Sequence, residues 1–442
     1  MALDPATLTQ LLGSIEADTL VLLCGAGLSI PAPSNLMSAV RVSQVCYAKY
    51  QPVAALPVAL RDDIDALAGH FHGLGEFLTV FLRRLVPWND LVGEPNAGHA
   101  AAADFLICGA ASAVLSANFD PMIEQWANAR KIALVGALDG HEAVAFRDTP
   151  APLLKFHGCL ARKRNETLWT QGQLHEPDVI TRVNSCSDWM RLHLPGKDLL
   201  VVGFWTDWGY LNSVLANAMN TQPFNSVTVI DPQDDATLQA KAPDLWARLT
   251  GAGFPFRHIR ASGSEALDDL RVGFSEVWSR RFFDLAGPLL QEEGKVLAPA
   301  TATTLGTLSC DDLYNFRRDG EGVPYDRAAS TKQPAAEAGP AALLHALLLQ
   351  AGAVRHGAWY SHAGQRVRIV HGSGQVLSTV RERYKEPPTA PEADIIVCAG
   401  AISAIVPGTL IPSGSGKSIM RPAHGGGSRW MTLDEARTEL GV

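Results

Sequence analysis

Short apolar runs alternate with helical patterns through the first two thirds of the chain. The runs cover 19–24, 113–117, 131–135, 152–156, 198–202 and 226–230. Each has the length of a buried strand, and apolar residues recur at three- and four-residue spacing in the stretches between them. Strands that alternate with helices indicate βαβ units. The pattern therefore predicts an α/β fold with a Rossmann-like, mostly parallel sheet and helices on both of its faces.

Two helical stretches lie between the first two runs, at 35–50 and about 57–86, and predict a helical insertion beside the sheet. An amphipathic helix at 264–282 is expected to close this unit. The following segment, 286–340, is rich in Pro, Ala, Thr and Gly, which is typical of a linker and connector.

The last hundred residues differ from the first unit in their pattern of apolar and polar residues. One apolar helix at 341–351, strand-like runs at 366–370 and 394–399, and a glycine-rich end predict a smaller α/β region. We therefore expect a catalytic domain at 1–285, a connector at 286–340 and a C-terminal α/β region at 341–442.

Composition and charge narrow the class of protein. A chain of 442 residues with 47% apolar residues has material for two domains. Its net charge of −8 and its lack of a long basic block argue against direct nucleic-acid binding. No segment has the apolar length of a membrane span, and the first residues do not resemble a secretory signal, so we expect a cytoplasmic protein.

The cysteines do not form a zinc or disulfide pattern. All seven are scattered, without a Cys-x-x-Cys pair, and most lie in apolar surroundings, which is typical of small buried residues. His70 and His72 have no carboxylate cluster near them in the sequence. We therefore expect no metal site.

The first apolar run leads directly into a glycine-rich turn. Gly25, Ala26 and Gly27 are followed one residue later by Ser29, and a helix is predicted beyond. A strand, a glycine turn and a helix start can form a cradle of backbone N–H groups for a pyrophosphate. However, Ile30 stands where the dinucleotide fingerprint has its third glycine, so a simple tight turn explains this segment about equally well.

Further polar residues follow other runs of the same predicted sheet. Asn118 and Asp120 follow one run, His157 ends another, and Gly203 and Asp231 follow two later ones. The carboxyl edge of a parallel sheet is where such folds bind ligands. Each residue also has a structural alternative, because His157 fits a core histidine and the Asn and Asp are good helix caps.

The order of these elements resembles the sirtuin family over about residues 10–285. The segment Pro95-Asn96-Ala97-Gly98-His99 adds to the resemblance, since it is similar to the Pro-Asn-x-x-His helix start of many sirtuins. The resemblance implies an NAD+ site. Its pyrophosphate and nicotinamide-ribose region would contact Gly25, Ala26, Gly27 and Ser29, with Asn118 and Asp120 beside that ribose, His157 as the catalytic histidine, and Gly203 and Asp231 near the adenosine half.

The chemistry implied by the resemblance suits these residue types. Cleavage of the bond between ribose and nicotinamide builds positive charge on the sugar, which the carboxylate of Asp120 can stabilise. The amide of Asn118 can orient a water or a ribose hydroxyl, and His157 can accept a proton.

Two departures from deacetylating sirtuins change the expected activity. Their four-cysteine zinc module follows the catalytic histidine, but this chain has only Cys159 and Cys186 in that region. Their Gly-Ile-Pro-Asp-Phe-Arg-like element is replaced by Ile-Pro-Ala-Pro-Ser-Asn, without the arginine. The chain instead resembles the zinc-free sirtuin-like domains of bacterial anti-phage defence proteins, which hydrolyse NAD+ to ADP-ribose and nicotinamide.

An NAD+ glycohydrolase must be restrained, because uncontrolled loss of NAD+ kills a cell. We therefore expect residues from about 300 to 442 to mediate homo-oligomerisation or to bind a partner. Related abortive-infection systems pair such domains with Argonaute-like proteins or translocase ATPases. Two alternatives stay open: a protein deacylase or ADP-ribosyltransferase that uses the same residues, and a non-catalytic module that senses NAD+ or ADP-ribose.

Overall fold

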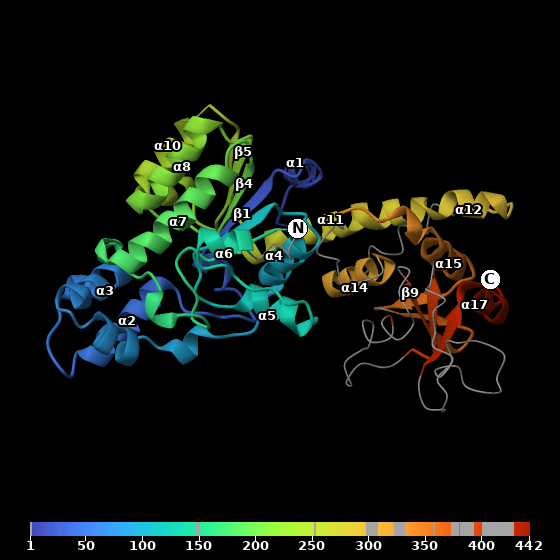
Figure 1. Cartoon of the computed structure of the whole chain (residues 1–442), viewed down its shortest axis with the longest axis horizontal. Coiled ribbons are helices and arrows are strands. Elements are labelled where there is room, and N and C mark those ends of the chain that lie inside the picture. The colour runs from blue at the N-terminus through green and yellow to red at the C-terminus, as the bar shows by residue number, and fades with distance from the viewer. Residues whose placement is uncertain are drawn as a thin grey trace. The chain divides into compact units, whose positions relative to one another are not determined.

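The computed structural model describes two compact units of the chain, Met1–Leu270 and Arg271–Val442 (Figure 1). The described residues are 2–145, 151–251, 253–297, 308–321, 332–357, 359–372, 380, 393–399 and 428–442.

A six-stranded parallel sheet forms the centre of the first unit, in the order β3-β2-β1-β4-β5-β6. The strands are β1 (Leu20–Cys24), β2 (Ala113–Ser116), β3 (Leu153–Leu154), β4 (Asp198–Val202), β5 (Ser226–Ile230) and β6 (Phe256–Ile259). This is the strand order of the Rossmann fold, and it confirms the predicted fold class. The order reverses between β1 and β4, which makes that pair the topological switch point of the sheet.

The strand register aligns the carboxyl-terminal ends of β1, β2 and β4 at the same edge of the sheet. Cys24, the last residue of β1, pairs with Ser116 of β2 and with Val202 of β4. The residues that follow these three strands therefore leave the sheet side by side, at its carboxyl edge.

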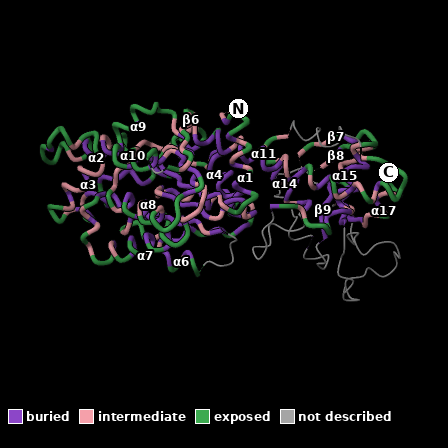
Figure 2. The backbone as a smooth tube through the Cα atoms, turned by 90° about the horizontal axis from the view of Figure 1, so that it is seen from above, coloured by how far each residue is buried: buried purple, intermediate pink, exposed green. Residues whose placement is uncertain are grey.

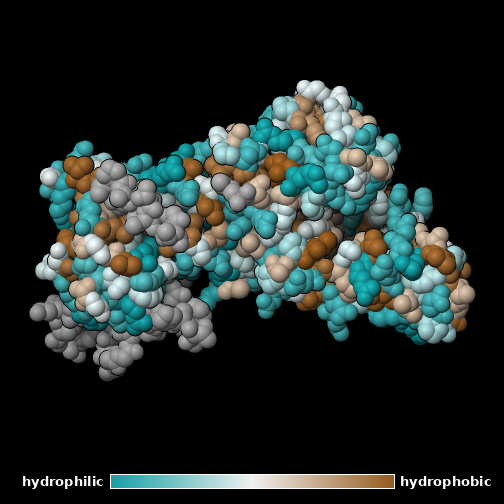
Figure 3. Space-filling model, turned by 180° about the vertical axis from the view of Figure 1, so that it is seen from behind, coloured by the Kyte–Doolittle hydropathy of each residue, from teal (hydrophilic) through white to brown (hydrophobic). Residues whose placement is uncertain are grey.

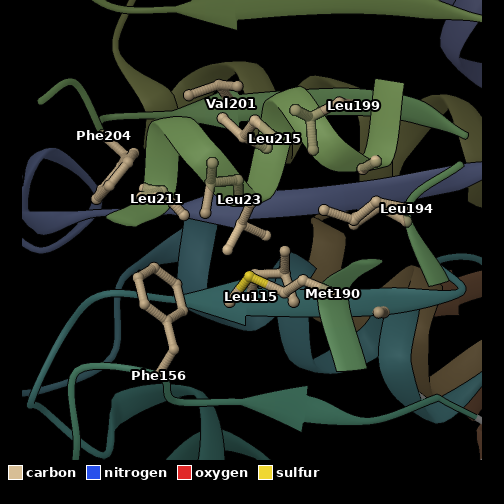
Figure 4. Close-up of a cluster of buried hydrophobic side chains, with 14 of the residues drawn as sticks. Leu23, Leu115, Phe156, Met190, Leu194, Leu199, Val201, Phe204, Leu211 and Leu215 are labelled. Carbon is tan, nitrogen blue, oxygen red and sulfur yellow. The ribbon is translucent and has the colours of Figure 1, made fainter. Parts of the chain in front are cut away.

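One face of the sheet is covered by α7 (Pro177–His193) and α8 (Gly209–Thr221), as Figure 4 shows. Side chains from alternate positions of β1, β2 and β4, including Leu23, Leu115 and Val201, form one buried cluster with these helices. Burial of each such side chain stabilises the fold by about 1.5–3 kcal/mol.

Helices also contact the sheet through α1 (Pro5–Glu16), which touches β1, and α4 (Ala97–Ile107), which touches β2. The sequence explains where α1 begins, because the Asp4 carboxylate accepts hydrogen bonds from two backbone amides of its first turn. The residues of α4 are almost entirely buried, in keeping with its run of alanines. In Figure 2 the buried backbone is concentrated around these central elements.

The helical insertion between β1 and β2 has a small core of its own, formed largely by aromatic residues. It contains α2 (Ala39–Tyr50), η2 (Val58–Leu60), α3 (Ile64–Gly73) and η3 (Phe77–Leu85). The predicted stretch at 57–86 is thus broken into three pieces. Gly75, with a positive φ of 72°, separates α3 from η3. Several apolar side chains of the insertion stay exposed, and hydrophobic areas interrupt the hydrophilic surface in Figure 3.

Two strand predictions differ from the structure. The expected strand at 131–135 is wrong: Lys131 has a φ of 62°, and the segment meets the sheet only through a bridge between Ala137 and Leu154. Ile132 and Leu134 are buried in a loop, while Ala133 and Val135 are exposed. Conversely, β6 escaped prediction because this edge strand is only partly buried and carries Arg257 and His258.

The second unit contains a mixed five-stranded sheet in the order β11-β10-β9-β8-β7. Its strands are β7 (Val354–His356), β8 (Trp359–His362), β9 (Gln365–His371), β10 (Ile395–Ala399) and β11 (Arg429–Thr432). Its helices include α12 (Ala286–Glu292), α14 (Cys310–Glu321), α15 (Gly339–Gln350) and α17 (Leu433–Leu440). The glycine-rich stretch at 400–427 lies outside the described residues.

The boundary between the units falls inside a helix and not at the predicted position after 285. Helix α11 (Gly263–Asp284) carries Trp278 and Phe282, whose rings pack against Phe316 of α14 at centroid distances of 5.8 and 5.2 Å. The segment 286–340, expected to be a connector, contributes α12 and α14 to the same core. These two helices were not predicted because the small residues and prolines of this segment are typical of a linker.

Candidate functional site

The glycine turn after β1 packs directly against the backbone that follows β4. The N–H groups of Gly25 and Gly27 donate to the carbonyl oxygens of Val202 and Gly203, at 3.0 and 2.9 Å. A Cβ on Gly27 would lie 2.7 Å from the Cα of Gly203, and Gly203 itself has a φ of 59°. These glycines are therefore required by a close backbone approach at the switch point.

This contact changes the expected role of the turn. The amides of Gly25 and Gly27 bind β4 and are not available to a phosphate in this conformation. Ala26, between them, is exposed and begins the short 3₁₀ helix η1 (Ala26–Leu28). The sequence correctly points to a tight turn here, in which Ala26 is exposed and Ser29 is buried.

The first turn of α4 holds the glycine turn from the other side. Asn96 caps α4 by accepting hydrogen bonds from the amides of Gly98 and His99. Its Nδ2 donates to the carbonyl oxygen of Leu28 at 2.7 Å. A Cβ on Gly98 would lie 2.5 Å from Leu28 Cδ1, so only glycine allows this approach. The segment from Asn96 to His99 is thus a support of the turn.

Ser29 lies at the centre of a buried polar network. Its hydroxyl donates to Asp120 Oδ2 at 2.9 Å and accepts from Asn118 Nδ2 at 3.1 Å. The Asn118 amide also donates to the carbonyl oxygen of Gly25 at 3.0 Å, and His99 Nε2 lies 3.0 Å from the Ser29 hydroxyl. Three of the predicted residues, Ser29, Asn118 and Asp120, therefore meet in one place.

The protonation of His99 follows from its partners. Its Nδ1 accepts a hydrogen bond from the backbone N–H of Asn96 at 3.2 Å, so Nε2 carries the proton and donates to Ser29. Burial lowers the pKa of His99 to about 4, against the opposing effect of the Asp120 carboxylate, and the ring is neutral at pH 7. His99 therefore cannot act as a base towards Ser29, because this histidine offers it no lone pair.

His99 is the residue of this network that sequence reasoning underestimated. The sequence indicates this segment only as support for the family resemblance, whereas His99 contacts Ser29 directly. The signal was present in the Pro-Asn-x-x-His spacing, which places a histidine at the third position of a capped helix, next to the cap residue.

His157 lies three residues beyond β3 and is buried. Its Nε2 lies 2.8 Å from the Tyr210 hydroxyl, and its ring centroid lies 4.9 Å from that of Trp208. Burial lowers the pKa of His157 to about 3, with a further contribution from the charge of Arg182. Among the described residues, no hydrogen bond joins His157 to Ser29, Asn118 or Asp120.

Gly203 and Asp231 occupy the β4–β5 side of the same edge. Gly203 belongs to the switch-point contact with Gly27, and its N–H donates to the carbonyl oxygen of Ile230 at 3.1 Å. Asp231 follows β5, and its Oδ1 accepts from the amide of Gln233 at 2.9 Å. The structure thus places Asp231 two strands away from the glycine turn and outside the Ser29 network.

The cysteines behave as structural residues: six of the seven are buried, as predicted. Of the two histidines considered as metal ligands, His70 and His72, the second pairs with Glu176 at 2.7 Å. Over the described ranges, no three side chains of His, Cys, Asp or Glu gather as a metal cluster.

Among the helices of the described residues, none is long and apolar enough to cross a membrane.

Comparison with known proteins gives matches only among solved structures; no protein-family model and no curated protein matches the chain. A Sir2 homolog–NAD complex matches at 16% identity over 59% of this chain and 91% of its own, with a TM-score of 0.35. A mutant Sir2 homologue bound to ADP-ribose matches at 16% identity over 61% and 95%, with a TM-score of 0.32. A structure that concerns the mechanism and regulation of Sir2 enzymes matches at 13% identity over 59% and 95%, with a TM-score of 0.32. Identities and TM-scores this low do not establish membership of that family.

The switch-point contact predicts a strong penalty for Gly203→Ala. A Cβ there would lie 2.6 Å from Gly27 Cα, on a residue with positive φ, so we expect unfolding in urea to become easier by about 2–4 kcal/mol. Gly13→Ala is the matched control, because nothing lies within 4 Å of its added Cβ and it sits inside α1. That change should stabilise the protein by about 0.5–1 kcal/mol. Equal midpoints for the two variants would contradict the contact.

The buried histidines predict loss of stability in mild acid. The folded pKa values of His99 and His157 lie below the ordinary value of 6.5, so the unfolded chain binds more protons as the pH falls below 6.5. Between pH 6.5 and about 4, each should lower the free energy of unfolding by up to about 1.4 kcal/mol per pH unit. Urea unfolding against pH measures the slope. His99→Gln should reduce it, and His141→Gln, at an exposed position of α6 (Gly140–Ala145), should leave it unchanged.

Proposed function

We propose that the first unit is an NAD+ glycohydrolase, which binds NAD+ at the carboxyl edge of the sheet and cleaves it to ADP-ribose and nicotinamide. One observation carries the proposal: Ser29, Asn118 and Asp120 form a buried network beside the switch point between β1 and β4. Doubly wound sheets bind dinucleotides at this position. The order of the sequence elements, which resembles that of sirtuins, supports NAD+ as the dinucleotide.

The proposed ligand extends along the edge of the sheet. Its pyrophosphate and nicotinamide ribose lie near the glycine turn, against Ala26 and Ser29, with Gly25 and Gly27 fixing the turn. Its adenosine half lies towards Gly203 and Asp231, because β5 follows β4 in the sheet. A carboxylate at the end of a strand is suited to binding ribose hydroxyls.

Hydrolysis uses the network and the histidine in different ways. A water oxygen attacks C1′ of the ribose as the bond to nicotinamide breaks, and nicotinamide leaves with the bonding electrons. The Asp120 carboxylate stabilises the positive charge that develops on the sugar, and Asn118 orients the water or a ribose hydroxyl. Neutral His157 accepts the proton released from water, and the proton then passes to solvent.

Hydrolysis is favoured over deacylation by the sequence after His157. Deacetylating sirtuins carry four zinc-binding cysteines there, and this chain has only Cys159 and Cys186 in the corresponding stretch. Cys186 is buried in α7 and lies 3.4 Å from the carbonyl oxygen of Leu138. An acetylated peptide is therefore not the preferred second substrate.

The proposed biological role is abortive infection, in which NAD+ loss stops phage replication at the cost of the cell. Such an activity requires control, and the second unit is the proposed place for it, through homo-oligomerisation or a partner protein. Argonaute-like proteins and translocase ATPases are candidate partners. The net charge of −8 favours nucleic-acid recognition by that partner and not by this chain.

A single set of incubations tests the proposal. The purified full chain, alone and with proteins encoded beside its gene, is incubated with NAD+ and with NAD+ plus an acetylated peptide. ADP-ribose that accumulates without peptide supports hydrolysis. Turnover that requires the peptide, or transfer of ADP-ribose to protein, would replace this proposal with deacylase or transferase activity, and binding without turnover would replace it with a sensor.

Replacement of Asn118 or His157 by Ala should lower kcat for nicotinamide release by roughly 10²- to 10⁴-fold, the range of general acid–base contributions. The variants should unfold cooperatively in urea, which separates a catalytic loss from misfolding. His141→Gln, at an exposed position of α6, is the control and should retain full activity. Undiminished NAD+ loss in the Asn118→Ala or His157→Ala protein would refute the site assignment.

A further inference from the structure

A buried ion pair lies directly behind the candidate site. Lys155 is 1% exposed, and its ammonium group lies 3.2 Å from Glu124 Oε1, on α5 (Met122–Ala129). Burial on its own would lower the pKa of Lys155, but the nearby Glu124, Cys159 and Asp120 together outweigh it and hold that pKa above its ordinary value. Lys155 is therefore charged, and none of the proposed chemical steps uses its ammonium group.

The Lys155 ammonium also joins the two loops that carry the proposed catalytic groups. It donates to the backbone carbonyl oxygen of Asp120, two residues beyond Asn118. Lys155 itself lies two residues before His157. A second bond, from the amide of Leu160 to the carbonyl oxygen of Phe119 at 2.8 Å, connects the same loops. One side chain thus reaches from the His157 loop to the Asn118–Asp120 loop.

The chain segment before β3 closes over this pair. A Cβ on Gly136 would lie 2.6 Å from Lys155 Cδ and 2.8 Å from Glu124 Oε1. The stem of Lys155 therefore has little freedom to leave its position. Packing of this kind restricts movement of the His157 loop relative to the Asn118–Asp120 loop.

Stability alone does not account for two buried charges at this position. Removal of a carboxylate and an ammonium from water is costly, and apolar side chains of similar volume often stabilise a fold as well or better. The distinctive property of this lysine is its bond to the Asp120 carbonyl, which a methionine of similar length cannot make.

We propose that Lys155 is a positioning residue, which fixes the Asn118–Asp120 loop relative to His157 through the Asp120 carbonyl oxygen. The effect on turnover rests on the proposed NAD+ hydrolysis. The mechanical part, the fixing of one loop by a side chain of the next, does not depend on that function.

The decisive variant is the double replacement Lys155→Met with Glu124→Gln. It removes both charges together, so no unpaired buried charge remains, and the protein should still unfold cooperatively in urea. The Asp120 carbonyl still loses its donor. We expect kcat for NAD+ hydrolysis to fall by about 10- to 100-fold while KM changes by less than about threefold, because small displacements of reacting groups have effects of this size.

Glu124→Gln alone is the matched control. It keeps Lys155 and its bond to the Asp120 carbonyl but leaves the ammonium without its carboxylate, so it should unfold at a lower urea concentration than the unmodified protein. For the folded protein we expect kcat within about threefold of the unmodified value. If the double variant had normal kcat, or if Glu124→Gln alone lost as much turnover as the double variant, the positioning role of Lys155 would be overturned.

Amide hydrogen exchange tests the mechanical part without any turnover. In the double variant, exchange should become faster in residues 116–124 than in the unmodified protein, while exchange in α1 stays the same. Unchanged exchange in 116–124 would overturn the inference even if NAD+ is hydrolysed. A protein that hydrolyses no NAD+ but shows the faster exchange would refute the proposed function and leave the loop-fixing role supported.

Discussion

The backbone contact between Gly27 and Gly203 is the constraint on which the candidate site depends. It binds the turn after β1 to the turn after β4, at the point where the strand order reverses. With the turn fixed there, Ser29 is directed away from β4 and towards the loop after β2, where Asn118 and Asp120 are found. The glycines act by allowing two backbones to approach, and the polar side chains beyond them form the buried network on which the proposed function rests.

Much of the fold was accessible from sequence because four central strands are short, predominantly apolar runs. Beta strands β1, β2, β4 and β5 are buried on both faces, and their ends predicted which polar residues share an edge. The segment at 131–135 has the same apolar character and failed, because burial of Ile132 and Leu134 occurs in a loop that forms no ladder. The apolar character of a segment indicates that its side chains are buried. Whether the segment forms a strand depends on pairing with another strand, which lies far away in the sequence.

The same limit applies within the site. Ser29, Asn118 and Asp120 were predicted together because each follows a strand, which is a local signal. The contacts of His99 and Lys155 were not, since each depends on atoms from another loop: the Ser29 hydroxyl in one case and the Asp120 carbonyl oxygen in the other. A histidine in a helix or a lysine after a strand can make many different contacts. Only the three-dimensional structure shows which of these contacts it makes.

Two buried neutral histidines border the site, and their hydrogen bonds separate their roles. His99 has both nitrogens committed, since Nδ1 accepts from the Asn96 main chain and Nε2 donates to Ser29. Protonation at Nδ1 would remove the hydrogen bond from the Asn96 N–H, which has no replacement acceptor at that nitrogen. His157 is bound at Nε2 by a single hydroxyl, that of Tyr210. A hydroxyl of a substrate or a water can replace that partner with a bond of the same kind, so a proton can be accepted at His157 without loss of a main-chain hydrogen bond. These differences support the proposal that His157 is the general base, while the hydrogen bond from His99 holds Ser29 in place.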